Sequence, residues 1–295
     1  MNQKEMDRRR YIPWIFLPTI IAVAIQSGAA IMALEFYIVS ALSTFHGDED
    51  YTGFVIKVMG DYAKGDGVAW TSIIYAVITT CIAFMIFRNK FREGKPSSLA
   101  GKSNNWALTV AGVILFTIGM QYVTVYLLNA FSAAFPSWLE EYKQLMDSAG
   151  LGTSMTVAMT AYAIILGPIC EELLFRGITF FAAKKVMPVY FAILVQAIMF
   201  GAFHMNKLQG TYAFVLGLGL GYIMYLYDSL ILTIIIHALF NLIGTLGGDY
   251  LPMGGDSLIS FFLCCLGALV VSYLSIICLK RGSALVNNDT NITDI

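Results

Sequence analysis

Eight apolar stretches, separated by shorter polar segments, set the pattern of this 295-residue chain. They lie at about residues 12–44, 68–87, 106–131, 154–183, 189–203, 212–227, 230–246 and 258–279. A helix needs about 20 predominantly apolar residues to cross a bilayer, and most of these stretches reach or approach that length. The pattern therefore predicts an all-α protein, a polytopic membrane helical bundle of about eight transmembrane helices.

The composition supports a membrane protein. Hydrophobic residues make up 58% of the chain and charged residues 13%, whereas soluble domains carry roughly 25% charged residues. The sequence has no basic stripe and no nucleic-acid-binding motif, so we expect the lipid bilayer and no nucleic acid as a partner. The polar segments are expected to be connections, with a short interfacial helix at residues 54–59.

Lysine and arginine gather in alternate connections. They occur before residue 12, at 88–102, at 184–185 and at 280–281, and the acidic connections lie between them. Basic residues mark the cytoplasmic ends of membrane helices. Eight spans then place both the N- and C-termini in the cytoplasm of a multi-pass plasma-membrane protein. We expect the first span, which follows three arginines at 8–10, to be a retained signal anchor.

Three ionisable side chains interrupt the fourth stretch: Glu171, Glu172 and Arg176. A charge at the bilayer centre costs about 3 kcal/mol by insertion scales, so each charge needs a partner or a function. Glu172 and Arg176 are four residues apart and share a helix face, so they can pair. Glu171 is rotated by about 100° and has no partner at helical spacing, which makes it the better candidate for a general base. Upstream, Gly167-Pro168 predicts a break in the helix.

Two of the three histidines lie within or at the edge of apolar stretches. His204 ends the fifth stretch, and His237 shares a helix face with Asn241 in the seventh. With Glu171 they suit hydrolysis, in which Glu171 takes a proton from water, His204 orients that water, and His237 and Asn241 donate to the oxyanion. Glu171, His204 and His237 could instead hold zinc with one open position, and the residues alone do not decide between these mechanisms.

The chain resembles the CAAX-protease and bacteriocin-processing (CPBP) family of membrane proteases over about residues 155–245. The family includes prenyl-protein proteases that remove the last three residues of CAAX proteins, and bacterial members linked to peptide processing, bacteriocin self-immunity and abortive infection. The resemblance implies that Glu171 and His204 activate water, that His237 and Asn241 form the oxyanion site, and that Glu172, Arg176 and Phe200 support them. It rests on three motifs in order: Glu171-Glu172-x-x-x-Arg176, Phe200-x-x-x-His204 and His237-x-x-x-Asn241.

The resemblance also divides the chain. Residues 1–153 are expected to hold N-terminal transmembrane helices and loops specific to this member, residues 154–246 a catalytic core, and residues 247–295 the last transmembrane helix and a cytoplasmic tail. The family has been described both as metalloproteases and as metal-independent glutamate-type proteases. We favour a site without a tightly held metal, because His237 and Asn241 as oxyanion donors leave only Glu171 and His204 as firm ligands. A divalent metal such as zinc is the alternative.

The expected function is an intramembrane endopeptidase that hydrolyses a peptide bond in a peptide or membrane-associated protein. A non-catalytic scaffold or bacteriocin-immunity protein of the same fold, which binds a partner protein, is the main alternative. It predicts that Glu171→Ala keeps function. A small-molecule or proton-coupled transporter is disfavoured because the sequence shows no inverted repeat. One conflict remains: a rise of about 1.5 Å per residue sets Glu171 and His204 more than about 10 Å apart in depth, whereas the motifs predict that they meet.

Overall fold

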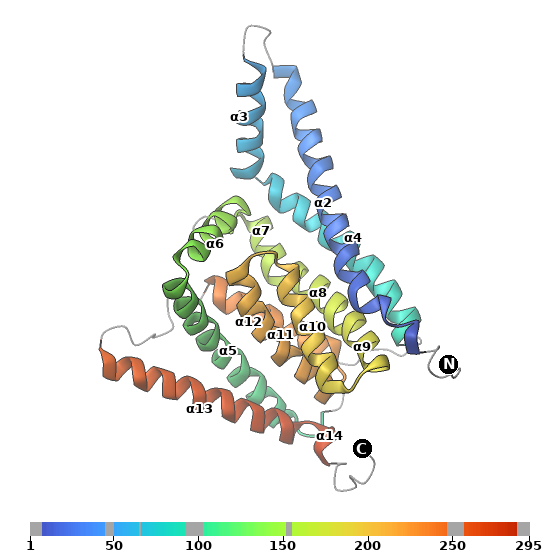
Figure 1. Cartoon of the computed structure of the whole chain (residues 1–295), viewed down its shortest axis with the longest axis vertical. Coiled ribbons are helices and arrows are strands. Elements are labelled where there is room, and N and C mark those ends of the chain that lie inside the picture. The colour runs from blue at the N-terminus through green and yellow to red at the C-terminus, as the bar shows by residue number, and fades with distance from the viewer. Residues whose placement is uncertain are drawn as a thin grey trace.

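The described part of the chain is almost entirely helical in the computed structural model (Figure 1). The structure describes residues 8–44, 50–64, 66–92, 103–151, 155–246 and 257–287. Within those ranges no β-strand is present, and the only isolated bridge joins Ser103 to Ser283. The predicted all-α class is therefore confirmed.

All eight predicted apolar stretches are helices, but they differ in length. Two of them, α10 (Val189–Phe203) and α12 (Leu230–Leu246), are short. The 15 residues of α10 extend about 22 Å, less than the roughly 30 Å of a hydrocarbon core. The polytopic membrane bundle is confirmed, with six full-length candidate spans among the described residues: α2 (Pro13–Ala41), Gly67–Phe91, α5 (Trp106–Ala134), Val157–Val186, α11 (Lys207–Tyr227) and α13 (Leu258–Gly282).

Two connections expected to be polar are themselves helices. The short interfacial helix predicted at residues 54–59 lies inside the longer α3 (Tyr51–Lys64). α3 and the end of α2 project together from the rest of the molecule (Figure 1), where the Tyr37 and Tyr62 rings lie 5.1 Å apart. The connection after α5 forms α6 (Pro136–Ser148), which has no buried residue. Since α6 carries aromatic and acidic side chains on an exposed helix, it suits the membrane surface.

The fourth span stays helical where a break was expected. It consists of α7 (Val157–Ala161), the π-helical η3 (Tyr162–Leu166), α8 (Gly167–Glu172), the π-helical η4 (Leu173–Thr179) and α9 (Phe180–Val186). Pro168 has no N–H to continue the α-helical hydrogen bonds. The chain adjusts by widening the preceding turn, so that the Gly167 N–H donates to the Tyr162 carbonyl five residues back. π-helical turns of this kind occur frequently at functional sites.

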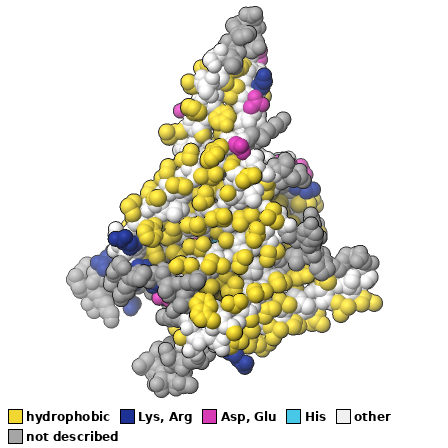
Figure 2. Space-filling model, turned by 180° about the vertical axis from the view of Figure 1, so that it is seen from behind, with side chains coloured by type: hydrophobic (Ala, Val, Ile, Leu, Met, Phe, Trp, Pro, Cys, Tyr) yellow, Lys and Arg dark blue, Asp and Glu magenta, His cyan; other side chains and the backbone are white. Residues whose placement is uncertain are grey.

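The helices α8 to α12 occupy the middle of the molecule (Figure 1). The helix Gly67–Phe91, made of α4 (Gly67–Ile86) and the π-helical η2 (Phe87–Phe91), packs with α2 along one side. α5 and α13 pack against each other along another side. Seen from behind, most of the broad surface is hydrophobic, as expected for contact with lipid (Figure 2).

Glycines allow α10 and α11 to pack closely. A side chain at Gly217 would come within 3.0 Å of the Ala197 backbone, and one at Gly201 within 2.6 Å of the Gly210 carbonyl. At Gly221 an added side chain would collide with the Gln196 amide. The spacing of Gly217 and Gly221 therefore serves close packing of helices.

Of the basic residues predicted for one side of the membrane, those that the structure describes gather at one end of the bundle, where Lys90 lies over the Trp14 ring and Lys185 over the Tyr11 ring. Arg92, after η2, pairs with Asp228 at the turn between α11 and α12, with 3.0 Å between Nη1 and Oδ2. At the same turn Tyr227 donates to the Leu279 carbonyl near the end of α13. Helices α4, α11 and α13 therefore meet at this end. The assignment of this end to the cytoplasm stays a prediction.

Candidate active site

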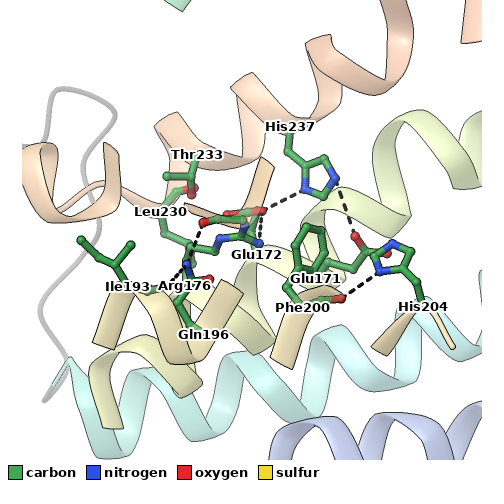
Figure 3. Close-up of polar contacts among 11 residues, drawn as sticks. Glu171, Glu172, Arg176, Ile193, Gln196, Phe200, His204, Leu230, Thr233 and His237 are labelled. Carbon is green, nitrogen blue, oxygen red and sulfur yellow. Dashed lines mark hydrogen bonds and ion pairs between the residues drawn. The ribbon is translucent and has the colours of Figure 1, made fainter. Parts of the chain in front are cut away.

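The buried part of the site is a charge network formed by Glu172, Arg176 and His237. The Arg176 Nη1 lies 2.9 Å from Oε1 of Glu172, and both side chains are 0% exposed. Nδ1 of His237, which is 3% exposed, lies 2.9 Å from the same oxygen (Figure 3). A carboxylate only accepts hydrogen bonds, so Nδ1 carries the proton it shares with Glu172. The expected Glu172–Arg176 pair thus forms, and it also fixes the orientation of the His237 ring.

Glu171 occupies the more open part of the site. Its side chain is 16% exposed, and its Oε2 lies 3.7 Å from Nε2 of His237. The carboxylate is directed between the rings of His237 and His204 (Figure 3), and it interacts electrostatically with His204. The separation of 3.7 Å is too long for a direct hydrogen bond. Glu171 is therefore the carboxylate that a water molecule can reach.

His204 follows the last residue of α10 and turns back over it. Its Nδ1 lies 2.9 Å from the Phe200 carbonyl one turn earlier. A carbonyl cannot donate, so Nδ1 is the donor and the neutral ring keeps its lone pair on Nε2. The backbone then reverses at Met205, which has a φ of 50°. The result is an imidazole with a fixed orientation beside Glu171.

Phe200 contacts both halves of the site. Its ring lies edge-on to His204 at 5.0 Å and to His237 at 5.6 Å, measured between ring centroids. The Arg176 guanidinium lies 4.4 Å from the centroid of the same ring. An aromatic face attracts a cation, and the effect is largest where water is excluded. Phe200 therefore separates the buried charge network from the open part of the site and packs against both.

Asn241 makes a contact that the sequence did not suggest. Its Nδ2 donates to the Ala163 carbonyl in η3, at 2.8 Å. In the π-helical register the donor for that carbonyl would be the N–H of residue 168, which is missing because residue 168 is Pro168. Asn241 therefore satisfies a carbonyl that the proline leaves without a donor. One of its two amide hydrogens remains for another partner.

The depth conflict between Glu171 and His204 is resolved by counting from the turn that joins their helices. Glu171 lies 15 residues before Val186, and His204 lies 15 residues after Val189. Because the two helices run in opposite directions from that turn, both residues lie about 22 Å along them. The predicted fifth span agrees with α10, whereas the fourth span ends at Val186 and not at residue 183 as expected. The expected difference in depth does not arise, and the two side chains lie beside each other (Figure 3).

The donor set does not fit the suggested zinc site. Among the described residues, no group of three or more His, Cys, Asp or Glu side chains is placed to hold a metal ion. Nδ1 of His237 is engaged by Glu172, and Nδ1 of His204 by the Phe200 carbonyl. The two Nε2 atoms and the Glu171 carboxylate remain as possible donors, but in the described part of the chain they are not gathered around one metal position.

Two further residues border the site and were not predicted from the sequence. Thr233 is fully buried one turn before His237 and lies beside Glu172 (Figure 3). The spacing of four residues from His237 was a signal that could have identified it. Tyr162, in η3, lies within electrostatic range of Glu171. No spacing rule pointed to Tyr162, because the π-helical turns displace it from its α-helical position.

The fold and the site define a polytopic membrane protein with a buried carboxylate–imidazole cluster in its central helices. Residues 153–243 match the family described as Rce1-like, type II CAAX prenyl endopeptidase Rce1-like. The match confirms the resemblance drawn from the motifs and places a domain of this kind over the central helices. It supports a CAAX-protease-type peptidase in general terms. No match was found among curated proteins or among solved structures.

Proposed function

We propose that this protein is an intramembrane endopeptidase that hydrolyses a peptide bond in a peptide or membrane-associated protein. The observation that carries the proposal is the placement of Glu171, a partly exposed carboxylate directed between two oriented imidazoles. Hydrolysis inside an apolar bundle needs a base for water and a fixed donor for the oxyanion. Residues 171, 204 and 237 supply groups of both kinds.

In the first step, Glu171 takes a proton from a water molecule oriented by Nε2 of His204. The resulting hydroxide attacks the carbonyl carbon, and the carbonyl π electrons move to the oxygen. In the second step, the tetrahedral intermediate reforms the carbonyl and the C–N bond breaks. The leaving amine takes the proton held by Glu171. Water is therefore divided between the new carboxyl and the new amine, and the site returns to its starting state.

His237 and Asn241 are proposed to stabilise the oxyanion. Nδ1 of His237 is held by Glu172, so Nε2 faces the open part of the site. Donation from Nε2 requires a proton on both ring nitrogens. Asn241 would contribute its remaining amide hydrogen. Donors fixed before the reaction are effective because they need no reorganisation when charge develops.

The family match suggests where the substrate comes from. A peptidase of the CAAX type would act on a segment held at the membrane, so the bilayer and a membrane-associated substrate are the proposed partners. The basic end of the bundle is proposed to face the cytoplasm, with both termini on that side of a plasma membrane. A helix as short as α10 leaves His204 within reach of one membrane surface.

The test compares new protein N-termini in membranes that contain wild-type protein or Glu171→Gln at equal amounts. The control is Glu141→Gln, which changes an exposed glutamate on α6, far from the carboxylate–imidazole cluster in sequence. We expect N-termini that are present with wild type and Glu141→Gln and absent with Glu171→Gln. Identical N-terminal profiles for all three would contradict the proposal and favour a non-catalytic scaffold.

A farnesylated, fluorescence-quenched CAAX peptide gives a finer test on the detergent-purified full chain. Cleavage that depends on Glu171 would assign the substrate to the class in the family description. Cleavage of the peptide at the same rate by wild type and Glu171→Gln would contradict a role for this carboxylate as base.

A further inference from the structure

Three tyrosine side chains lie within electrostatic range of Glu171, and the proposed mechanism uses none of them. Tyr75 belongs to α4, Tyr162 to η3 and Tyr212 to α11. A tyrosine hydroxyl can donate one hydrogen bond without carrying a charge. The surroundings of each hydroxyl decide whether a substrate held beside Glu171 can use it.

Two of the three hydroxyls are already engaged. Tyr75 is 2% exposed, and its hydroxyl accepts from the Cys170 thiol at 3.9 Å. The Tyr212 hydroxyl is engaged by Tyr142, and the two rings pack edge-on with 6.4 Å between their centroids. These contacts join α4 to α8 and α6 to α11. Tyr162 is therefore the tyrosine whose hydroxyl a substrate can use.

The Tyr162 ring lies over Gly167. Its Cζ atom, which carries the hydroxyl, is 3.9 Å from the position that a Cβ atom of residue 167 would occupy. A side chain longer than one carbon at residue 167 would compete with the ring for this space. Gly167 precedes Glu171 by four residues within α8, so the two share a helix face. The hydroxyl therefore lies over the turn that precedes Glu171, on the face from which its carboxylate extends.

Two hydrogen bonds fix the backbone around Tyr162. Its carbonyl accepts the Gly167 N–H across the π-helical turn of η3. The next carbonyl, that of Ala163, accepts from the Asn241 amide at 2.8 Å and so ties η3 to α12. The Tyr162 ring is itself half-buried and packs against the hydrophobic core. Its orientation is therefore set before a substrate binds, which makes a donor effective when charge develops.

The Tyr162 hydroxyl and the proposed oxyanion donors lie at neighbouring levels of the bundle. In α12, His237 lies beside Glu171. One turn later, Asn241 reaches the Ala163 carbonyl in η3. Helix carbonyls point toward the C-terminal end of their helix, so the Asn241 amide lies over the turn that leads to Glu171. The Tyr162 hydroxyl lies over that same turn.

We propose that Tyr162 is a further catalytic residue, whose hydroxyl donates to the oxyanion of the tetrahedral intermediate together with His237 and Asn241. The inference rests on the proposed peptidase function. His237 can donate from Nε2 only when both ring nitrogens carry protons, and Asn241 has already used one amide hydrogen. The Tyr162 hydroxyl donates as a neutral group, and a hydrogen bond from a hydroxyl to an oxyanion is short and strong. Its proton stays on Tyr162 throughout, so the division of water between the products is unchanged.

The test is steady-state cleavage of the farnesylated, fluorescence-quenched CAAX peptide by the detergent-purified full chain. Tyr162→Phe keeps the ring over Gly167 and removes only the hydroxyl. Tyr75→Phe is the matched control, because it removes a hydroxyl near the same carboxylate that a substrate cannot reach. We expect Tyr162→Phe to lower kcat by about 10²-fold, with KM and the unfolding midpoint unchanged. Tyr75→Phe should keep the kcat of wild type.

The Glu171-dependent N-termini in membranes give a second readout that does not depend on the choice of peptide. They should be depleted with Tyr162→Phe and retained with Tyr75→Phe. Wild-type rates in Tyr162→Phe, where Glu171→Gln is inactive, would overturn this inference and leave the proposed peptidase function standing. Absence of Glu171-dependent products from both readouts would instead contradict the proposed function, and this inference with it.

Three further outcomes would also overturn the role of the Tyr162 hydroxyl. Equal losses of kcat in the two tyrosine variants would show a general effect of removing hydroxyls near Glu171. A loss of stability that accounts for the loss of cleavage would make Tyr162 a structural residue. A shifted pH dependence of kcat/KM with retained kcat would show that the hydroxyl acts only through Glu171.

Discussion

Glu171 and Glu172 are neighbours in the sequence, yet they lie in opposite surroundings. Glu172 is fully buried against Arg176 and His237, and each contact lies at 2.9 Å. Glu171 is partly exposed, and its shortest ion pair, to His237, measures 3.7 Å. The difference arises from the rotation of about 100° between successive residues, which turns one carboxylate into the bundle and the other toward the open part of the site.

The two carboxylates have different roles, one in positioning His237 and the other in accepting a proton, and a single carboxylate could not fill both. A carboxylate in short contact with a buried cation is a poor proton acceptor, because its charge is compensated. A carboxylate with room for water can accept a proton and release it again. The buried half of the site, formed by Glu172 and Arg176, therefore positions His237. The open half, formed by Glu171 and His204, is proposed to perform the chemistry.

The largest expected effect concerns the buried half. Arg176→Leu leaves the Glu172 carboxylate buried without its counter-charge, which we expect to lower the free energy of unfolding by about 3–5 kcal/mol. Lys207→Gln breaks the exposed pair with Glu141 and should cost less than about 1 kcal/mol. Denaturant unfolding of the purified proteins measures both. Equal, small losses would show that the buried pair does not support the fold.

The next effect concerns the open half. His204→Gln keeps a polar side chain but removes the imidazole that is proposed to orient water, so kcat should fall by about 10²–10⁴-fold. The unfolding free energy should change little, because this side chain ends a helix. Steady-state cleavage and unfolding of the same preparation give both values. A loss of stability that accounts for the loss of activity would place His204 in the structural half instead.

Asn241 distinguishes a catalytic donor from a structural one. Asn241→Leu removes the bond to the Ala163 carbonyl and should lower kcat by about 10²-fold if the amide also serves the oxyanion. Pro168→Ala restores a backbone N–H at the start of α8 and so supplies a donor for that carbonyl in η3. The combined variant should keep a kcat about 10²-fold below that of wild type. Recovery of cleavage in the combined variant would show that Asn241 acts only through the backbone of η3.

The smallest effect is expected at the boundary between the two halves. Phe200→Leu keeps an apolar side chain but loses the edge contacts with both imidazoles and the contact with Arg176. Each contact of this kind contributes about 0.5–1.5 kcal/mol, so we expect about a tenfold lower kcat and a modest loss of stability. Kinetics and unfolding on one preparation test this. A change in only one of the two quantities would assign Phe200 to a single half.

The sequence predicted the parts of this account that depend on helical periodicity. The apolar stretches identified the helices, and the spacing of four residues identified the Glu172–Arg176 pair. The motifs, and not hydropathy, predicted that Glu171 and His204 lie close together, because hydropathy places helix ends only to within a few residues. The domain limits at 153 and 246 remain a prediction.

Other features of the fold and the site depend on contacts between distant segments and could not be predicted from the sequence. The π-helical turns of η3 and η4 shift the helix register, so periodicity fails around Tyr162 and Ala163. The contact of Asn241 with Ala163 requires both that shift and Pro168. The α6 helix was taken for a connection because Glu140, Glu141, Lys143 and Asp147 make the segment polar.

The most direct test of the central comparison is to measure cleavage and unfolding for Glu171→Gln and Glu172→Gln side by side. Both variants keep the shape of the side chain and remove one charge. We predict that Glu171→Gln loses cleavage by at least about 10³-fold at unchanged stability. Glu172→Gln should lose about 3 kcal/mol of stability, because Arg176 is left buried without a counter-charge. Equal effects of the two substitutions on both quantities would contradict the division of the site.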